Sequence, residues 1–433
     1  MEEQKVAALV AGSKLHEEKL NKIFNAINNW DGLEEDAYDP MKNKNLHSSI
    51  AEAKKSMIPE SYIQRILQYS KQGYNSIEFP TYDVDWDSEA YLTVSGQNSN
   101  NSVRVTNDFL NAVEEDADFR LIDPKTNEAC KTINARSLWW QILNARAETG
   151  EPYMINIDTC NEALPQGQKD LGLEIKQSNL CSEITLVTNE ERTAVCCLSS
   201  VNLEHYDTWS EEPLFISDLI TMLDNVLQHF IDNAIDTEQL GEYNANFKRF
   251  SKYIKEGKEG FTKAAYSAYR ERSVGLGAMG FHAYLQSNQI TFEGIFATGF
   301  NYKAFKHIKS KAVEATKVLA AERGEAPDVH GSGLRNSHLL AIAPNASSSI
   351  ICGGTSPSIE PYRANVYTHK TLSGSYKVKN KNLERLINKK VPETNKRKKL
   401  WQQISDNRGS IQNIRIFTKE EKELFKTADE INQ

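Results

Sequence analysis

Residues 177–184 place an amide, a thiol and a carboxylate at every second position. These groups belong to Asn179, Cys181 and Glu183. In an extended backbone alternate side chains point to one face, so we expect the three on the same side of a strand. Such a face offers a hydrogen-bonding amide, a sulfur able to carry covalent or radical chemistry, and a proton acceptor. The alternative is a half-buried strand with a structural cysteine, because free Cys is among the most buried residue types.

A second thiol pair follows, Cys196 and Cys197, inside an apolar run that predicts a buried strand. Adjacent residues on a strand face opposite sides, so only one of the two thiols can share a face with a given neighbour. A disulfide between them would need strained geometry, and we expect none. If this strand lies near residues 177–184, one thiol can serve as a redox partner there. Two buried core cysteines are the alternative.

A third candidate follows a strand-like run at 339–342. It is a stretch of small and polar residues: Pro344, Asn345, Ala346, Ser347, Ser348 and Ser349. The free N–H groups and hydroxyls at the start of a helix can hold an anion such as phosphate. It is not a Walker A loop, because no Gly-Lys-Ser/Thr follows. An ordinary helix cap or loop is the alternative.

The elements that would position these groups alternate between helix and strand. Apolar periodicity predicts helices within 6–67 and at 137–149, 214–234 and 303–323, and strands at 90–94, 103–105, 153–157 and 193–198. Thr106 is expected to cap a helix, and the pair Trp139 and Trp140 to lie in the core. This order favours an α/β sheet or barrel wrapped by helices.

Composition narrows the class of protein. The 433 residues are 39% hydrophobic and 25% charged, which is typical of a globular protein, and the net charge of −8 argues against direct nucleic-acid binding. The chain has no apolar run long enough to span a bilayer and no signal-peptide layout at its start. Its six cysteines form no CxxC pair, so we expect neither a disulfide scaffold nor a metal site. We expect a cytoplasmic protein whose thiols are reduced.

Two further patterns favour structural interpretations. His282 lies in an apolar stretch and is expected to be a core histidine whose hydrogen bonds are satisfied. Gly275, Gly277 and Gly280 have the spacing of a dinucleotide fingerprint, but they follow a charged helical run rather than a strand. We therefore interpret the three glycines as helix packing.

Five segments in order resemble the catalytic subunit of ribonucleotide reductase. They are residues 178–184, 196–203, 272–282, 344–349, and finally 358–362 together with 365–368 and 372–374. The similarity runs from about residue 6 to the end and is most like the class I, aerobic enzymes of bacteria and their phages. Glu360 and Tyr362 match a family segment that lines the site.

The resemblance implies a ten-stranded α/β barrel with a central finger loop. Cys181 would become the thiyl radical that abstracts the 3′ hydrogen, Glu183 would accept the 3′-hydroxyl proton, and Asn179 would hydrogen-bond the ribose. Cys196 would reduce the 2′ position and become half of a disulfide, with Cys197 facing away. Substrate contacts would come from Ser178 and from the run Pro344, Asn345, Ala346, Ser347, Ser348 and Ser349, which would hold the diphosphate.

The family's partners are implied in the same way. They are a ribonucleoside diphosphate, a metal-containing small subunit that supplies the radical, and thioredoxin or glutaredoxin, with no cofactor bound directly. Neither Cys130 nor Cys160 fits the second reducing cysteine. From the resemblance we also expect that the regulatory nucleotide domain (ATP-cone), most ATP and dNTP effector sites and the last barrel strand lie outside this sequence.

The chain is therefore expected to be a central piece of the subunit. Residues 1–140 would be the remainder of the first half-barrel with helices, and residues 141–433 the finger loop and second half-barrel. We expect it to be inactive alone and to need companion fragments, as in a split gene, in the cytoplasm of a cell or of an infected bacterial host.

Two alternatives remain. An adenosylcobalamin-dependent reductase would share the finger loop, and the amino-acid sequence at 97–105 is compatible with that class. An inactive remnant is the other alternative, against which stands the intact set Asn179, Cys181, Glu183 and Cys196.

Overall fold

The computed structural model describes residues 2–56, 58–78, 101–123, 125–242, 244–371 and 374–431. It has two compact units, Met1–Asn156 and Ile157–Gln433. These units are defined by their compactness. The boundary expected at residue 140 instead divides two halves of a barrel, and that boundary stays a prediction. The strand expected at 90–94 and the positions 372–373 of the last matched segment lie outside the described residues.

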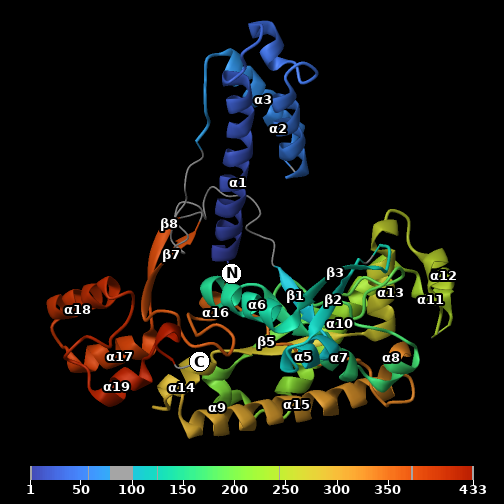
Figure 1. The fold of residues 1–433 in the computed structure, drawn as a ribbon. Coiled ribbons are helices and arrows are strands. Elements are labelled where there is room, and N and C mark those ends of the chain that lie inside the picture. Colours follow the sequence, from blue (N-terminus) through green and yellow to red (C-terminus); the bar gives the residue numbers. More distant parts are fainter. Residues whose placement is uncertain are drawn as a thin grey trace. The chain divides into compact units, whose positions relative to one another are not determined.

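The first unit combines a helical part with short strands (Figure 1). Its elements are α1 (Glu2–Asn28), η1 (Glu34–Tyr38), α2 (Lys44–Lys55), α3 (Glu60–Lys71), β1 (Ser102–Val105), α5 (Asn107–Glu114), β2 (Asp118–Ile122), β3 (Ala129–Asn134), α6 (Ala135–Thr149) and β4 (Tyr153–Asn156). Strand β1 pairs in parallel with β4, and β2 pairs antiparallel with β3. The helices expected within 6–67 are confirmed.

Local sequence signals in this unit behave as expected, with one exception. The Thr106 hydroxyl accepts a hydrogen bond from the Phe109 N–H at 3.2 Å and caps α5, as predicted. Trp139 packs its ring against Phe109. The prediction that Trp140 is also core is wrong, because its side chain is 59% exposed. Neighbouring helix positions point about 100° apart, so a pair of tryptophans does not share one buried face.

The second unit holds most of the segments that match the reductase family. Its elements up to β6 are α7 (Ile157–Glu162), α8 (Gln166–Asp170), β5 (Cys197–Asn202), η2 (Leu203–His205), α9 (Tyr206–Trp209), α10 (Phe215–Ala234), α11 (Thr237–Leu240), α12 (Phe247–Phe250), η3 (Ser251–Tyr253), η4 (Glu259–Phe261), α13 (Thr262–Glu271) and β6 (Val274–Met279). The later elements are α14 (Phe281–Ser287), α15 (Ile295–Arg323), η5 (Pro327–Val329), α16 (Ser348–Ile351), β7 (Val366–Thr371), β8 (Gly374–Lys379), α17 (Lys381–Lys390), α18 (Thr394–Asp406), α19 (Lys419–Leu424) and η6 (Ala428–Glu430).

The centre of this unit is a parallel pair of strands, β5 and β6. Cys197 lies opposite Val274 and Asn202 opposite Met279. A third segment continues the parallel arrangement beyond β6, because the Leu276 N–H donates to the Leu339 carbonyl at 2.8 Å. Within the described ranges each named sheet has two strands, so these residues alone do not close a barrel.

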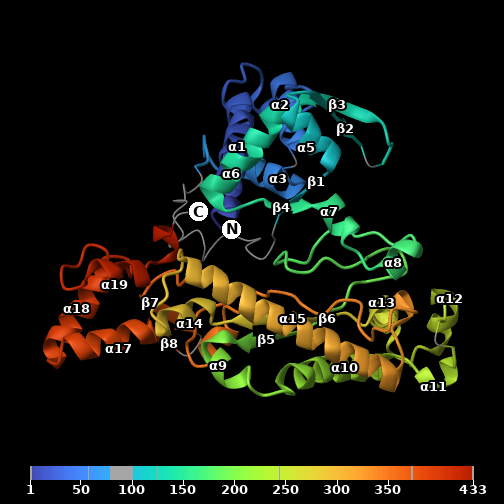
Figure 2. The ribbon, with the colours of Figure 1, turned by 90° about the horizontal axis from the view of Figure 1, so that it is seen from below.

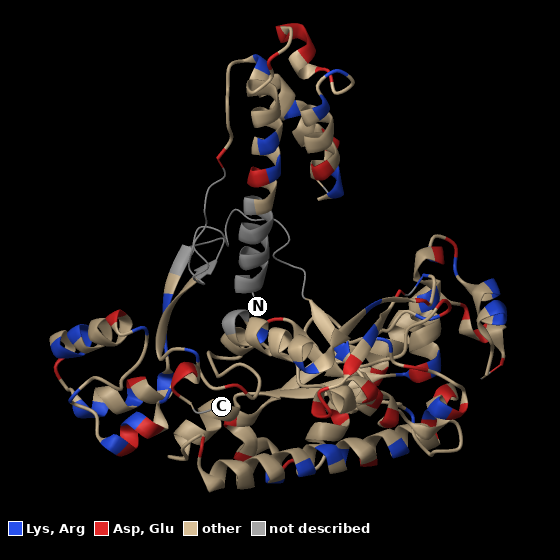
Figure 3. Ribbon diagram, in the orientation of Figure 1, with Lys and Arg blue, Asp and Glu red and all other residues tan. Residues whose placement is uncertain are grey.

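Two long helices cover one face of these strands. In Figure 2, α10 and α15 run side by side along β5 and β6. Val201 from β5, together with Leu276 and Ala278 from β6, belongs to one hydrophobic cluster with residues of both helices. Neither strand contains a charged residue, whereas charges are spread over the surrounding helices (Figure 3). Because the two helices bury this face, only the opposite side of each strand can contribute to a site.

The structure changes two expectations for this region. The strand expected at 193–198 begins only at Cys197. The glycine pattern does not lie in a packed helix, because Gly275 and Gly277 are in β6, whose six residues are all buried. A Cβ atom built on Gly277 would lie 2.3 Å from the Ala341 carbonyl oxygen. These glycines allow neighbouring strands to approach closely, a known use of glycine inside strands.

Adding a methyl group at Gly277 should therefore destabilise the second unit. We expect Gly277→Ala to lower the free energy of unfolding by about 1–3 kcal/mol, because the Ala341 backbone must move. Gly260→Ala is the control: no heavy atom lies within 4 Å of its Cβ position, and its backbone is not left-handed. Urea unfolding of both variants measures the difference. Equal stabilities would contradict the close packing seen at β6.

Among the described residues, no helix is both long and apolar enough to cross a membrane.

Candidate functional site

The side of β5 and β6 turned away from α10 and α15 carries the sequence-predicted thiol. We call it the Cys196 face. It includes Leu198 and Ser200 from the region of β5, and Gly275 and Gly277 from β6. A Cβ atom on Gly275 would lie 3.3 Å from the Cys196 sulfur and 2.5 Å from Leu198 Cδ2. Glycine at this position lets Leu198 and Ala341 pack against β6 next to the thiol, and a larger side chain would have to displace them.

The two neighbouring cysteines have different surroundings, as strand alternation predicts. Cys197 packs against hydrophobic clusters formed with the helices. Cys196 lies on the opposite side, against Gly275. All six cysteines are free thiols, which agrees with the expectation that these two form no disulfide. Of this pair, only Cys196 lies on the side turned away from the helices.

The segment that carries Cys181 is a tight turn rather than a strand. The Asn179 N–H donates to the Ile184 carbonyl at 3.1 Å, and the Asn179 side-chain oxygen accepts from the Ile184 N–H at 3.1 Å. Ser182 has a left-handed backbone with φ of 66°. The premise that an extended strand places Asn179, Cys181 and Glu183 on one face is therefore wrong. Asparagine side chains bond readily to nearby backbone, and here that local bond closes the turn.

Glu183 nevertheless links the two candidate thiols electrostatically. Cys181 is exposed, and partial burial together with the Glu183 charge raises the pKa of its thiol. Burial, the neighbouring Cys197, and the charges of Glu183 and Glu271 raise the pKa of the Cys196 thiol to about 12. Both thiols are thus protonated at neutral pH. The Glu183 Oε2 atom is buried and has no hydrogen-bond partner among the described residues.

Asn345 ties the Ser-rich segment to the Cys196 face. Its side-chain amide donates to Ser200 Oγ at 3.0 Å, to the Ala278 carbonyl at 3.2 Å and to the Ala343 carbonyl at 2.8 Å. Its backbone is left-handed, with φ of 54°, a conformation that asparagine tolerates better than most residues. The amide group is therefore engaged with the protein and positions the loop.

The rest of this loop is mostly open to solvent. Pro344, Ala346, Ser347 and Ser348 are exposed, whereas Ser349 is buried and its hydroxyl donates to the Ala346 carbonyl at 3.3 Å. A short helix, α16, begins at Ser348 as the sequence suggested. The structure thus places the proposed anion-binding residues beside the strands of the Cys196 face.

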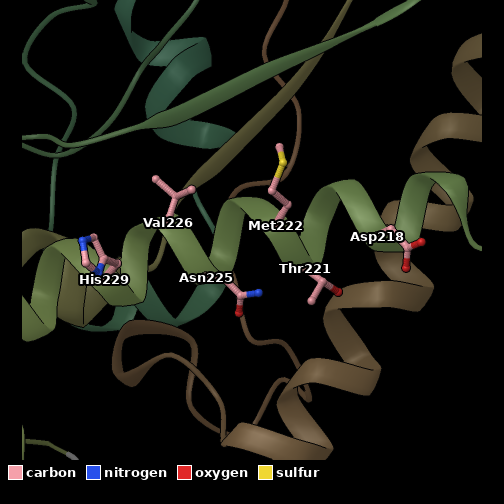
Figure 4. Close-up of a pocket in the computed structure, with 6 residues that line it drawn as sticks. All are labelled: Asp218, Thr221, Met222, Asn225, Val226 and His229. Atoms are coloured by element: carbon pink, nitrogen blue, oxygen red, sulfur yellow. The ribbon is translucent and has the colours of Figure 1, made fainter.

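A pocket elsewhere in the unit does not coincide with this site. It lies along one face of α10 and is lined by Asp218, Thr221, Met222, Asn225, Val226 and His229 (Figure 4). None of the sequence-predicted site residues contributes to it. Among the described residues, no group of three or more His, Cys, Asp or Glu side chains is arranged to hold a metal ion.

His282 is a core residue, as expected. Its Nδ1 accepts a hydrogen bond from the Tyr362 N–H at 3.0 Å, and its ring is fully buried. Burial lowers the pKa of His282 to about 4, so the ring is neutral at physiological pH. Burial likewise raises the pKa of Glu360, which lies next to Tyr362 in the family-matched segment.

The sequence did not single out two residues that the structure brings to this site. Ser200 holds the loop amide, and alternation along the strand from Cys196 could have indicated it. Glu271 is buried beside the start of β6 and its charge acts on Cys196. Its sequence position at the end of a charged helical run gave no such signal, because the neighbouring Arg270 and Arg272 suggest an exposed helix end.

Comparison with known proteins identifies the family of this chain. The family model for the ribonucleotide reductase barrel domain matches residues 52–332 and 326–433. The large subunit of ribonucleoside-diphosphate reductase from Invertebrate iridescent virus 3 is 48% identical over 313 residues, which is 72% of this chain and 46% of the viral protein. A vitamin B12-dependent ribonucleotide reductase from Agrobacterium fabrum is 42% identical over 217 residues, covering 50% of this chain and 16% of that protein.

A solved structure of a ribonucleotide reductase subunit is also similar to this chain. The alpha subunit of the class Id ribonucleotide reductase from Actinobacillus ureae superposes with a TM-score of 0.60 and 33% identity, over 75% of this chain and 53% of that one. The chain thus spans about half the length of the viral subunit and of this structural relative. The matched family residues include both candidate thiols and the Ser-rich segment, and we conclude that the chain belongs to the ribonucleotide reductase family and corresponds to the barrel domain of its large subunit.

Proposed function

We propose that this chain forms the part of a ribonucleoside-diphosphate reductase in which the ribose is reduced. The observation that carries the proposal is the Cys196 face. It presents a thiol beside strand glycines, close to a carboxylate whose buried oxygen has no partner in the described structure. Family membership supports the assignment of the reaction to this face.

In this proposal the side chains act in sequence. Cys181 carries the thiyl radical that takes the 3′ hydrogen, and Glu183 accepts the proton of the 3′-hydroxyl. Proton transfer by a positioned carboxylate contributes about 10²–10⁴-fold to a rate. The C2′–O bond then breaks and the hydroxyl leaves as water. Cys196 and a second thiol supply the proton for that water and the two electrons and become a disulfide, which an external dithiol reduces. Cys181 finally returns its hydrogen to C3′ and becomes a thiyl radical again.

The substrate contacts are proposed from the loop geometry. The exposed residues from Pro344 to Ser348 would face the diphosphate, while Asn345 fixes the loop to Ser200. Ser178 lies at the start of the turn that carries Cys181, where its hydroxyl donates to the Asn179 carbonyl at 3.1 Å. Asn179 closes that turn through its side-chain oxygen, and its proposed contact with the ribose would come from the amide nitrogen of the same side chain.

We further propose that turnover needs other polypeptides. Protein side chains do not generate radicals unaided, so a metal-containing small subunit would supply the oxidising equivalent. In the described residues β5 pairs with β6 alone, and an unpaired strand edge is a ready site for another strand. Companion segments of the large subunit would pair there and provide the second reducing thiol. Thioredoxin or glutaredoxin would restore the dithiol, in the cytoplasm.

A pair of adjacent substitutions tests the assignment of the reducing thiol. In a reconstituted mixture, Cys196→Ser should reduce formation of deoxycytidine diphosphate to the assay background. Cys197→Ser should keep most of the activity, because Cys197 packs against the helices. The two variants make the same chemical change at neighbouring positions. Equal activity of the two would contradict the proposed role of Cys196.

The likeness to the vitamin B12-dependent enzyme supports a second candidate, an adenosylcobalamin-dependent reductase. Both candidates use the same thiols and differ in the source of the radical. Adding adenosylcobalamin in place of the small subunit separates them: turnover with the cofactor alone would favour the second candidate.

A further inference from the structure

A buried polar cluster lies where β6 begins. Glu271, the last residue of α13, is 2% exposed, and its Oε2 accepts a hydrogen bond from the Ser273 hydroxyl at 3.3 Å. Its Oε1 is 3.4 Å from the Arg192 guanidinium. Ser273 Oγ also lies 3.0 Å from Ser337 Oγ and 3.4 Å from His338 Nδ1. None of these side chains has a role in the proposed reaction.

The strand register places this cluster beside the reducing thiol. Cys197 is opposite Val274, so Cys196 precedes β5 at the level of Ser273. Residues two apart on an extended chain point to one side, which puts Ser273 on the same side as Gly275. The Cys196 sulfur lies against Gly275 on that side. The carboxylate held by Ser273 is therefore close enough for its charge to act on Cys196.

The groups around Glu271 allow its carboxyl to gain or lose a proton near neutral pH. Arg192 is held mainly by Asp328, through two hydrogen bonds, and Arg270 also donates to Asp328. Burial raises the pKa of Glu271 to about 7, with the Asp328 charge acting in the same direction and Arg192 opposing it. His338 faces the cluster as a neutral ring, because burial lowers its pKa to about 4.

We propose that Glu271 is a positioning residue for Cys196: its carboxylate, fixed by Ser273 at the level of Cys196 on the paired strand, disfavours the thiolate form of the neighbouring thiol. This inference rests on the proposed role of Cys196 as reductant. A thiol, unlike a thiolate, can supply a proton to the leaving hydroxyl, and it resists premature oxidation. Glu183 adds a second negative charge with the same effect.

Site-resolved alkylation of the full chain tests this without any turnover. Iodoacetamide reacts with the thiolate, so the rate at each cysteine follows its thiolate fraction. In Glu271→Gln the charge is lost and the pKa of Cys196 should fall. A fall of about half a unit to one unit raises its alkylation rate about three- to tenfold at pH 9. Peptide mass spectrometry reads each cysteine separately.

Cys197 is the internal control for this experiment. After burial, the charges that act on its thiol are those of Arg272 and Asp224. Its rate should not change in Glu271→Gln, and neither rate should change in Glu314→Gln, which removes a carboxylate from the exposed face of α15. An unchanged Cys196 rate would overturn the proposal. So would an equal rise at both cysteines, because that indicates general loosening of the strands.

Ser273→Ala provides a second variant if Glu271→Gln does not fold. The Ser273 hydrogen bond favours the ionised form of Glu271, so losing it raises the pKa of that carboxyl. Cys196 should then be alkylated faster than in the parent chain near pH 7–8, and at the same rate at pH 10, where Glu271 is ionised in both. A constant ratio across this range would overturn the proposal.

The alkylation experiment on Glu271→Gln and the turnover experiment on Cys196→Ser can succeed or fail independently of each other. If Cys196→Ser abolishes turnover but Glu271→Gln leaves alkylation unchanged, the reductant assignment stands and the role of Glu271 falls. If Glu271→Gln accelerates Cys196 alone but Cys196→Ser keeps turnover, the electrostatic coupling stands and the reductant assignment falls.

Discussion

Replacing Cys181 with alanine is expected to remove ribonucleotide reduction entirely while leaving the fold intact. The sulfur is exposed on a turn whose closing hydrogen bonds come from Asn179 and Ile184, so the fold does not depend on it. The proposed radical step has no substitute, because carbon cannot carry the radical as a thiol sulfur does. Product formation from labelled cytidine diphosphate in the reconstituted enzyme measures the effect.

The control is Cys130→Ala, which removes an exposed thiol from β3 in the first unit. That variant should retain activity, and both variants should unfold at the urea concentration of the parent chain. Turnover that survives in Cys181→Ala would contradict the proposed radical site, whatever the behaviour of the other cysteines.

The second large effect concerns stability. Asp224 on α10 is fully buried and receives hydrogen bonds from four side chains, namely Arg272, Arg323, Arg335 and Asn336. Asp224→Asn keeps the shape but leaves three guanidinium groups without their shared carboxylate. Breaking a buried ion pair in this way costs about 3–5 kcal/mol. We expect a loss of that size in the free energy of unfolding.

The pH dependence gives this prediction a sign. Burial alone would raise the pKa of Asp224, but Arg272 and Arg335 outweigh it and hold the pKa below its usual value. A carboxyl with a lowered pKa stabilises the folded state above its unfolded pKa, and that contribution is lost as pH falls through the folded value. The gap between parent and variant should therefore narrow in acid.

Asp218→Asn, an exposed position on the same helix, is the matched control, and it should change stability by less than about 1 kcal/mol. Urea unfolding at several pH values measures all three proteins. A variant at Asp224 as stable as the parent at neutral pH would show that the arginine cluster does not depend on this carboxylate.

Sequence reasoning succeeded where one local signal controlled the outcome. Helical periodicity predicted α10 and the part of α15 from residue 303 onward, although α15 begins at Ile295. Thr106 predicted the start of α5, and strand alternation predicted that Cys196 and Cys197 face opposite sides. Each depends on side-chain direction or capping within a few residues. The resemblance of short segments identified the family, because five segments occurred in the right order.

Sequence reasoning failed where tertiary contacts or local hydrogen bonds competed with the sequence pattern. Alternation at 177–184 predicted a strand, but Asn179 bonds its own backbone neighbour and closes a turn. The glycine spacing suggested helix packing, and only the approach of Ala341 shows why Gly275 and Gly277 occupy a strand. The action of Glu271 on Cys196 depends on the pairing of β5 with β6, which no local pattern reveals.

The central claim is that this chain carries the thiols that reduce a ribonucleotide. The most direct measurement is reduction of labelled cytidine diphosphate with dithiothreitol. It compares the chain alone with the chain mixed with companion segments of the large subunit and the radical-generating small subunit. The account predicts product only in the full mixture, and none when Cys181 is replaced by alanine. No product in any mixture, from a chain that is soluble and folded, would contradict it.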